Sequence, residues 1–182
     1  MAAMPAVTLP EELPGADVTR PVRIAVTGHR FFDEAAAAYI TAHVGAVLDE
    51  ATAGAAVRVV TSLAEGADQL VAQEAVRRGI PVEVIVPAAG YAESLAGAAD
   101  RRRYQELLTR AASVRTLDHR RPTPQAYLDA GLVMLAGADR LIAVWDGAPA
   151  RGTGGSAQIV ARARELQLDL HVIWPPDYDR PR

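Results

Sequence analysis

The sequence predicts an α/β fold of the Rossmann-like, doubly wound type, with a mostly parallel sheet and helices on both faces. Short apolar segments rich in β-branched residues alternate with longer, alanine-rich segments of helical character. Each parallel connection needs a crossover, and the crossover helices bury both faces of the strands, which explains the continuous apolar runs. With 182 residues, half of them hydrophobic, the chain can bury the core of one domain.

The elements follow one another in a regular order. Residues 21–29 form an apolar run that enters a glycine, as a first strand would, and the alanine-rich stretch 33–54 ends in glycine, as a helix would. Further strand-like and helix-like segments then alternate, and a last strand closes the series. The remaining strands are expected over 57–63, 81–87, 113–117, 140–146 and 168–175, and the remaining helices over 64–79, 100–112, 123–138 and 154–168.

The chain divides into an arm, a domain and a tail. Residues 1–20 show little periodicity and belong to a stretch with four prolines between Pro5 and Pro21, so we expect a poorly ordered arm there. A Rossmann-like domain is expected over 21–176, and residues 177–182 are expected to form a C-terminal tail.

The charge, cysteine content and apolar runs of the chain limit the partners and the cellular location that we expect. The 19 basic and 22 acidic residues give a formal net charge of −3, so no global field attracts nucleic acid or an anionic membrane, and we expect neither as a partner. The chain has no cysteine, which is consistent with a reducing compartment. No apolar run reaches the roughly 20 residues that span a bilayer, and no signal peptide is recognisable at the start. We therefore expect a cytoplasmic protein.

Three loops stand out at the predicted carboxyl edge of the sheet, where open α/β sheets bind ligands and where helix N-termini attract anions. They follow the first, second and fifth strands and combine small residues with hydrogen-bond donors. Their convergence indicates a ligand that contains phosphate. The candidate ligand-binding residues are Thr27, Gly28, His29, Arg30, Ser62, Leu63, Ala64, Gly66, Asp68, Trp145, Asp146, Gly152, Thr153, Gly154, Gly155, Ser156 and Gln158.

The glycines of the loop after the fifth strand, which we call the late loop, are the main evidence for this interpretation. Gly152, Gly154 and Gly155 lie within four residues at a strand-to-helix junction, where a plain connector would not need the conformational entropy that they cost. Gly28 and Gly66 taken singly are equally well explained as a turn or a helix cap. No loop has the three spaced glycines of a dinucleotide fingerprint or the Gly-Lys-Ser/Thr of a P-loop, so we expect neither a classical dehydrogenase nor a P-loop NTPase.

Other conspicuous residues have two readings. Trp145 is either core or a cover for a base, and Asp146 either accepts ribose hydroxyls or begins a turn. The cluster Arg101–Arg103 points in several directions around a helix and is best read as a solvated face. The histidines show no spacing with acids that indicates a metal, so we expect no metal and no cofactor.

Three segments resemble the SLOG superfamily, which includes LOG-type phosphoribohydrolases and the DNA-processing protein DprA. They are VTGHR at 26–30, TSLAEGADQLVAQEA at 61–75, and ADRLIAVWDG at 138–147 followed by ARGTGGSAQIV at 150–160. The resemblance extends over residues 22 to about 174. It implies a nucleotide or nucleotide-derived ligand held across the three loops, a homodimer, and Arg103 as a further candidate for the site.

The chain departs from LOG enzymes just after the late loop. In those enzymes a carboxylate in the first turn of the helix is associated with cleavage of the N-glycosidic bond, whereas here Ala157, Gln158 and Ile159 occupy the corresponding places. A neutral amide cannot replace a carboxylate as a base, although Asp146 or Glu65 could supply one from another loop. The reading that we favour is a module that senses or sequesters a nucleotide-derived small molecule, coupled to an effector protein on another chain. The alternatives are a nucleoside 5′-monophosphate phosphoribohydrolase and, disfavoured by the acidic balance, a DprA-like nucleic-acid binder.

Overall fold

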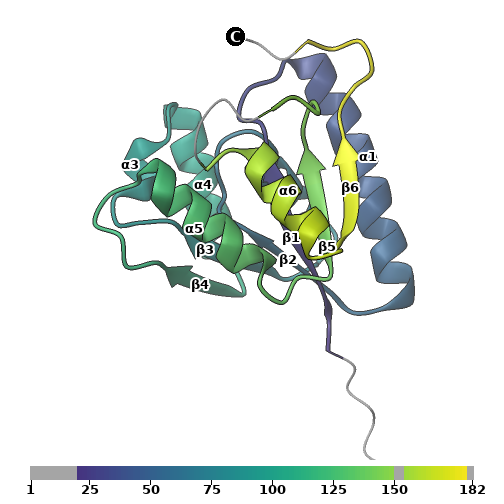
Figure 1. Ribbon diagram of the computed structural model, residues 1–182, viewed down its shortest axis with the longest axis horizontal. Coiled ribbons are helices and arrows are strands. Elements are labelled where there is room, and N and C mark those ends of the chain that lie inside the picture. Colours follow the sequence, from purple (N-terminus) through teal and green to yellow (C-terminus); the bar gives the residue numbers. More distant parts are fainter. Residues whose placement is uncertain (1–19, 150–153, 180–182) are drawn as a thin grey trace, which may run out of the picture.

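In the residues that the computed structural model describes, 20–149 and 154–179, six strands form one parallel sheet (Figure 1). Every neighbouring pair of strands is parallel, in the order β4-β3-β2-β1-β5-β6. The predicted doubly wound α/β fold is therefore confirmed. The strands are β1 (Val22–Gly28), β2 (Val57–Thr61), β3 (Val82–Val86), β4 (Ser113–Thr116), β5 (Arg140–Val144) and β6 (Asp169–Ile173).

Helices cover both faces of the sheet and divide the core into two clusters. One cluster packs α1, α2 and α4 against one face, and the other packs α5 and α6 against the opposite face. The segment between β3 and β4 differs from expectation, because a short helix, α3, precedes the predicted one. The helices are α1 (Glu34–Gly54), α2 (Ala67–Arg77), α3 (Tyr91–Ser94), α4 (Ala98–Thr109), α5 (Pro124–Leu135) and α6 (Ser156–Glu165).

Local signals explain where two of the helices start. Asp33 caps α1, because its side chain accepts a hydrogen bond from the backbone N–H of Ala36 at 2.8 Å. Thr123 caps α5 in the same way through Ala126, and Pro124 occupies the first helical position, where a missing N–H costs nothing. These caps therefore set the points at which the two helices leave the edge of the sheet.

The chain changes direction across the sheet between β1 and β5. From β1 it proceeds outward through β2, β3 and β4, and it then returns to the other side of β1 to form β5 and β6. Such a switch point separates the loops that follow the two central strands and opens a crevice at their carboxyl ends. The fold thus leaves room for a ligand beside the loops after β1 and β5.

The arm and the tail expected at the two ends of the chain both extend past the described residues, which leave out 1–19 and 180–182. The arm expected over residues 1–20 lies outside the described residues except for Arg20, whose guanidinium pairs with Asp139 at the start of β5. None of the helices in the described part of the chain is long and apolar enough to cross a membrane.

Candidate functional site

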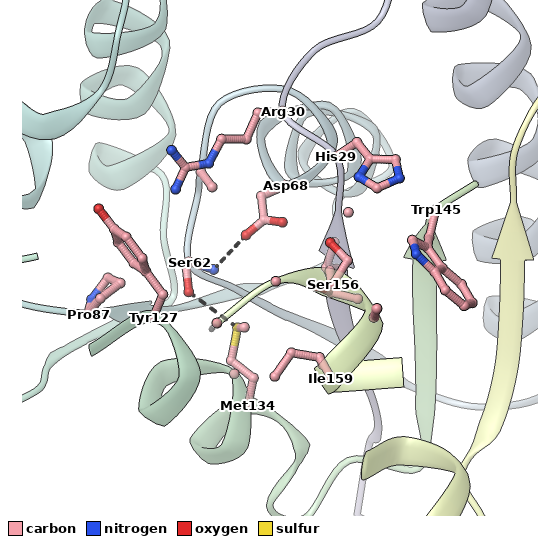
Figure 2. A pocket seen from close by; sticks show the side chains of 18 of the residues that line it. His29, Arg30, Ser62, Asp68, Pro87, Tyr127, Met134, Trp145, Ser156 and Ile159 are labelled. Atoms are coloured by element: carbon pink, nitrogen blue, oxygen red, sulfur yellow. Dashed lines mark hydrogen bonds between the residues drawn. The ribbon is translucent and has the colours of Figure 1, made fainter. Parts of the chain in front are cut away.

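A cavity of about 580 Å³ lies at the carboxyl edge of the sheet (Figure 2). Its walls come from the loops after β1, β2, β3 and β5, together with α5 and the first turns of α2 and α6. The volume falls in the range of small-molecule sites, which is about 300–1,000 Å³. The cavity could therefore hold a ligand of nucleotide size.

The cavity brings together most of the residues singled out in the sequence. All three predicted loops contribute to its lining, so residues far apart along the chain share one wall. The predicted residues that line it are Thr27, Gly28, His29, Arg30, Ser62, Ala64, Asp68, Trp145, Gly154, Gly155 and Ser156.

Some candidates lie away from the cavity in the described structure. The Leu63 side chain is fully buried in the core. Gly66 packs closely on the chain, because a Cβ there would lie 2.3 Å from the carbonyl oxygen of Arg30. Arg103 lies on α4 with its Nη1 3.6 Å from Oδ1 of Asp100.

The late loop and the end of β5 contain the remaining candidates. Asp146 lines a separate hollow with Trp174, next to the cavity wall. The Gln158 side chain points back to its own loop, where Oε1 accepts the backbone N–H of Gly154 at 2.5 Å. Two further candidates, Gly152 and Thr153, lie outside the described residues.

Asp68 holds the β2–α2 loop in shape. Its Oδ2 accepts hydrogen bonds from the Thr61 hydroxyl at 3.0 Å and from the backbone N–H of Ser62 at 3.1 Å. The Thr61 oxygen in turn accepts the N–H of Leu63 at 3.1 Å. Leu63 has φ of 56°, a left-handed conformation that is costly for a residue other than glycine. The Asp68 network thus supports a strained turn that places Ser62 at the cavity.

The environment of Asp68 also changes its acidity. Burial raises the pKa of Asp68 to about 6, and the hydrogen bonds from Thr61 and Ser62 and the charge of Arg30 oppose that rise only in part. Asp68 is also the one carboxylate among the described residues that line the cavity.

His29 closes the end of β1. Its backbone N–H donates to the Val144 carbonyl at 2.9 Å, and its carbonyl accepts the N–H of Ala67 at 3.1 Å, which joins β1 to β5 and to α2. The ring Nε2 lies 2.9 Å from Oδ1 of Asp146, and the ring meets Trp174 edge-on at 5.0 Å. These contacts fix the imidazole in the wall between the cavity and the neighbouring hollow.

Arg30 is the one arginine or lysine among the described residues that line the cavity. Its Nη1 lies 3.3 Å from Oε1 of Glu65, and its guanidinium lies over the Tyr127 ring, 5.3 Å from the centroid. Burial alone would lower the pKa of Arg30, but the charge of Glu65, with the nearby Tyr91 and Tyr127, gives a net rise. The arginine is thereby held in place while 41% of its side chain stays exposed.

Sequence reasoning missed the part of the lining that α5 contributes. The signal was available, because Thr123-Pro124 is a typical helix start, and a helix after a strand of a parallel sheet begins at the carboxyl edge. The loop after β3 was missed as well, although it ends a strand at the same edge. The lining residues outside the prediction are Val26, Pro87, Tyr91, Pro124, Tyr127, Gly131, Met134, Pro149, Ala157 and Ile159.

The first turn of α6 presents the hydroxyl of Ser156 and two apolar side chains to the cavity. Ala157 and Ile159 line it, and Gln158 bonds to its own loop. The two acids that could replace a carboxylate there have other partners, since Glu65 pairs with Arg30 and Asp146 approaches His29. In the part of the chain that the structure describes, no group of three His, Asp or Glu residues could hold a metal ion.

Comparisons with known proteins place the fold. No family model and no curated protein matches the chain. DprA from Streptococcus pneumoniae is 17% identical, with a TM-score of 0.63 over 87% of this chain. DprA from Helicobacter pylori is 16% identical, with a TM-score of 0.62 over 87% of this chain. The structural-genomics target TM1055 is 16% identical, with a TM-score of 0.47; the match covers 84% of this chain and 92% of that one.

These likenesses are partial for the two DprA proteins. This chain spans 52% of the pneumococcal protein and 68% of the H. pylori protein. The chain therefore shares the fold of the two DprA proteins, and at these identities the likeness extends to the fold alone.

One expectation needs correction. Net charge led us to expect that nucleic acid is an unlikely partner, but the H. pylori structure that shares this fold is described for its binding of single-stranded DNA. A formal charge of −3 is a sum over the whole molecule and does not describe the potential at one edge of a sheet. The expectation that nucleic acid is an unlikely partner was therefore wrong.

Proposed function

We propose that the chain binds a nucleotide in the cavity at the carboxyl edge of the sheet. The observation that carries this proposal is the convergence of the loops after β1, β2 and β5 on one cavity of about 580 Å³. Aromatic and apolar side chains, such as Tyr127, Met134 and Trp145, offer surfaces for a base, and Arg30 offers a cation for a phosphate.

The dipoles of the surrounding helices support the same assignment. Residues from the starts of α2, α5 and α6 line the cavity, so the positive ends of three helix dipoles lie around it. Gly155 precedes α6 and has no side chain to cap it. Neither α2 nor α6 has a side-chain cap, so the oxygens of a phosphate near Arg30 would accept hydrogen bonds from the backbone N–H groups at these two helix starts.

The two described glycines of the late loop have different roles in this proposal. Gly154 has φ of +81°, and a Cβ there would lie 2.5 Å from the Pro124 carbonyl, so it allows the loop to pack on α5. Its N–H is also taken by Gln158. Gly155 has φ of −84° and ψ of 163°, which any residue can adopt, and it lines the cavity. Gly155 is therefore the cleaner position at which to test ligand approach.

The first experiment measures binding of AMP, ADP, ADP-ribose and NAD by calorimetry and thermal unfolding. A ligand present at 100 times its Kd should raise the Tm by roughly 5–10 °C. Gly155→Val should weaken binding by roughly tenfold or more, because the side chain occupies the space of the ligand. Gly54→Val is the matched control, since a Cβ on Gly54 meets nothing within 4 Å.

Two results would contradict the proposal. One is a flat thermal response to the whole nucleotide panel. The other is an undiminished affinity of the Gly155→Val variant, which would place the ligand elsewhere. Circular dichroism of both valine variants checks that the fold is retained, because valine also caps a helix less well than glycine.

Binding of single-stranded DNA is a second candidate function, favoured by the likeness to the two DprA proteins. In this case the nucleotide in the cavity would belong to a strand, and Arg30 would contact a phosphodiester. A labelled oligonucleotide should then bind with an affinity that falls steeply as salt increases. Arg30→Ala should lower the affinity for both AMP and the oligonucleotide if one site serves both. An oligonucleotide whose affinity is unchanged by this variant and by excess AMP binds at another site. An oligonucleotide that does not bind at all contradicts this second function.

A further inference from the structure

Glu65 is a buried acid beside the cation of the cavity. It lies in the β2–α2 loop with 3% of its surface exposed, and its Oε1 is 3.3 Å from Nη1 of Arg30. Its Oε2 is buried and has no hydrogen-bond partner among the described residues. An unpaired buried carboxylate oxygen costs free energy of folding.

The position of Glu65 changes the charge that a ligand would meet. Arg30 is the one lysine or arginine among the described lining residues, and Glu65 faces it from behind the cavity wall. The carboxyl of Asp68 also lines the cavity. One guanidinium thus lies near two carboxyl groups, and these side chains give no surplus of positive charge for a polyanion.

Arg30 nevertheless keeps donors for one anionic group. A guanidinium has five N–H groups in a planar fork, and Glu65 takes one long contact on Nη1. Tyr127 supports the plane of the guanidinium from one side. Glu65 therefore acts through Arg30: it holds the side chain at the cavity and cancels part of its charge.

We propose that Glu65 is a specificity-determining residue that limits the cavity to a ligand with a single phosphate group. This inference rests on the proposed nucleotide binding. The first phosphate pairs with Arg30 and the helix starts, while each further phosphate adds negative charge close to Glu65 without another described cation to match it. Repulsion between like charges at a partly desolvated site is strong enough to discriminate between such ligands.

The test compares the Kd values of AMP, ADP and ATP for the full chain and for Glu65→Gln. Buffers contain EDTA, because Mg²⁺ would neutralise the additional phosphates. The unaltered protein should bind AMP roughly tenfold more tightly than ATP, and Glu65→Gln should remove most of that preference, mainly by improving ATP binding. Glu65→Asp, which keeps the charge, should retain the preference for AMP.

Glu83→Gln is the matched control. Like Glu65, Glu83 forms an ion pair with arginine, in this case with both Arg23 and Arg58. Glu83 lies near the start of β3, away from the carboxyl edge. The Glu83→Gln substitution changes the net charge of the molecule by the same amount as Glu65→Gln. Because Glu83 lies away from the cavity, this control should leave the ratio of the Kd values of AMP and ATP unchanged.

The outcomes separate the two proposals. If AMP binds and the AMP to ATP ratio is the same in Glu65→Gln and the unaltered protein, the role of Glu65 is refuted and nucleotide binding stands. An equal change in Glu83→Gln refutes it too, since the effect is then one of net charge. If none of these nucleotides binds any variant, both proposals fail. Should Glu65→Gln not fold, the same ratio measured with Glu65→Ala decides.

Discussion

At the scale of single residues, Asp68 combines a structural and an electrostatic role. Its carboxyl group organises the turn that holds Leu63 in a left-handed conformation, and it also lines the cavity. Burial makes this group harder to ionise in the folded protein than in the unfolded chain. The stability of the fold should therefore depend on pH through this residue.

The pH dependence has a definite sign. Between the ordinary pKa of 3.8 and the raised value of about 6, the folded state holds a proton on Asp68 that the unfolded state has lost. The contribution of Asp68 to the free energy of unfolding is thus largest below pH 4, decreases as the pH rises to about 6, and is constant above. Asp68→Asn, whose amide oxygen can still accept the two hydrogen bonds, should remove this contribution.

Urea unfolding at pH 4, 5, 6 and 7 provides the measurement. The difference between the unaltered protein and Asp68→Asn isolates Asp68 from Asp49 and Asp139, whose lowered pKa values act in the opposite direction. A difference that is independent of pH would show that Asp68 titrates normally.

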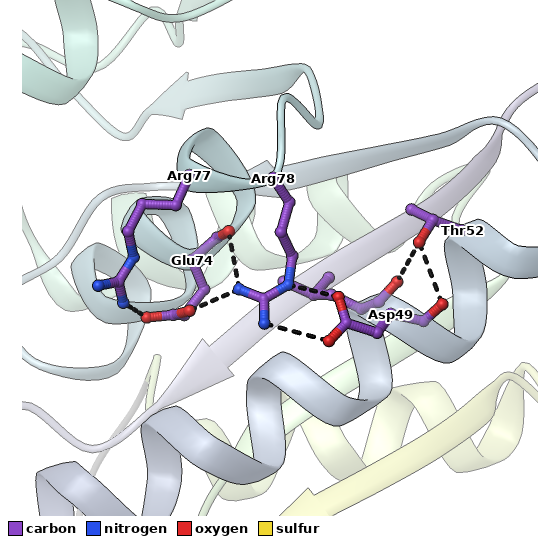
Figure 3. Close-up of polar contacts among 6 residues, drawn as sticks. Asp49, Thr52, Glu74, Arg77 and Arg78 are labelled. Carbon is purple, nitrogen blue, oxygen red and sulfur yellow. Dashed lines mark hydrogen bonds and ion pairs between the residues drawn. The ribbon is translucent and has the colours of Figure 1, made fainter.

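At the scale of elements, a charged cluster joins α1 to α2 on the face away from α5 and α6 (Figure 3). Arg78 follows α2 and contacts the buried carboxylate of Glu74 at 2.6 Å and the exposed Asp49 of α1 at 2.7 Å. A Cβ on Gly45 would lie 2.6 Å from Nη2 of Arg78, so the guanidinium lies against α1. Glu74 also pairs with Arg77.

The burial of each acid predicts how much it contributes to the free energy of unfolding. Glu74 is 4% exposed, and Glu74→Ala should lower the free energy of unfolding by about 2 kcal/mol, because it leaves the guanidinium of Arg78 without its buried partner. Asp49→Ala should have little effect, since the side chain of Asp49 is 64% exposed and exposed pairs contribute little. Chemical denaturation of both variants tests this order, and equal effects would contradict it.

At the scale of the whole molecule, the switch point between β1 and β5 concentrates loops of different origin at one edge. The opposite edge holds the turns that lead into β2 and β3. A ligand in the cavity should therefore affect segments that are distant in sequence but share an edge.

Hydrogen exchange tests this expectation. Saturating AMP should slow amide exchange in peptides covering 26–31, 61–68 and 154–159, because binding suppresses local opening at the carboxyl edge. Peptides covering 54–57 and 79–82, from the opposite edge, should exchange at unchanged rates. Protection confined to the second set, or spread evenly over the chain, would contradict the assigned site.

Much of this architecture could be predicted from the sequence alone. Alternation of apolar runs with helical segments requires parallel strands with crossovers, and parallel strands bring their following loops to one edge. For this reason the loops at Thr27, Ser62 and Gly155 could be grouped before any coordinates were known. The period of the pattern determined the fold class, and the order of strands and helices determined the edge.

Only the tertiary structure decided which side chains meet at that edge. Gly28 looked like a place for a ligand, yet a Cβ there would lie 2.4 Å from Cβ of Ala67, so it also allows α2 to pack on β1. Tyr127 and Glu65 drew no attention as partners of Arg30, because they come from separate crossovers. The direction of a side chain depends on how helices distant in sequence pack against each other, and that information is not contained in the local pattern of the chain.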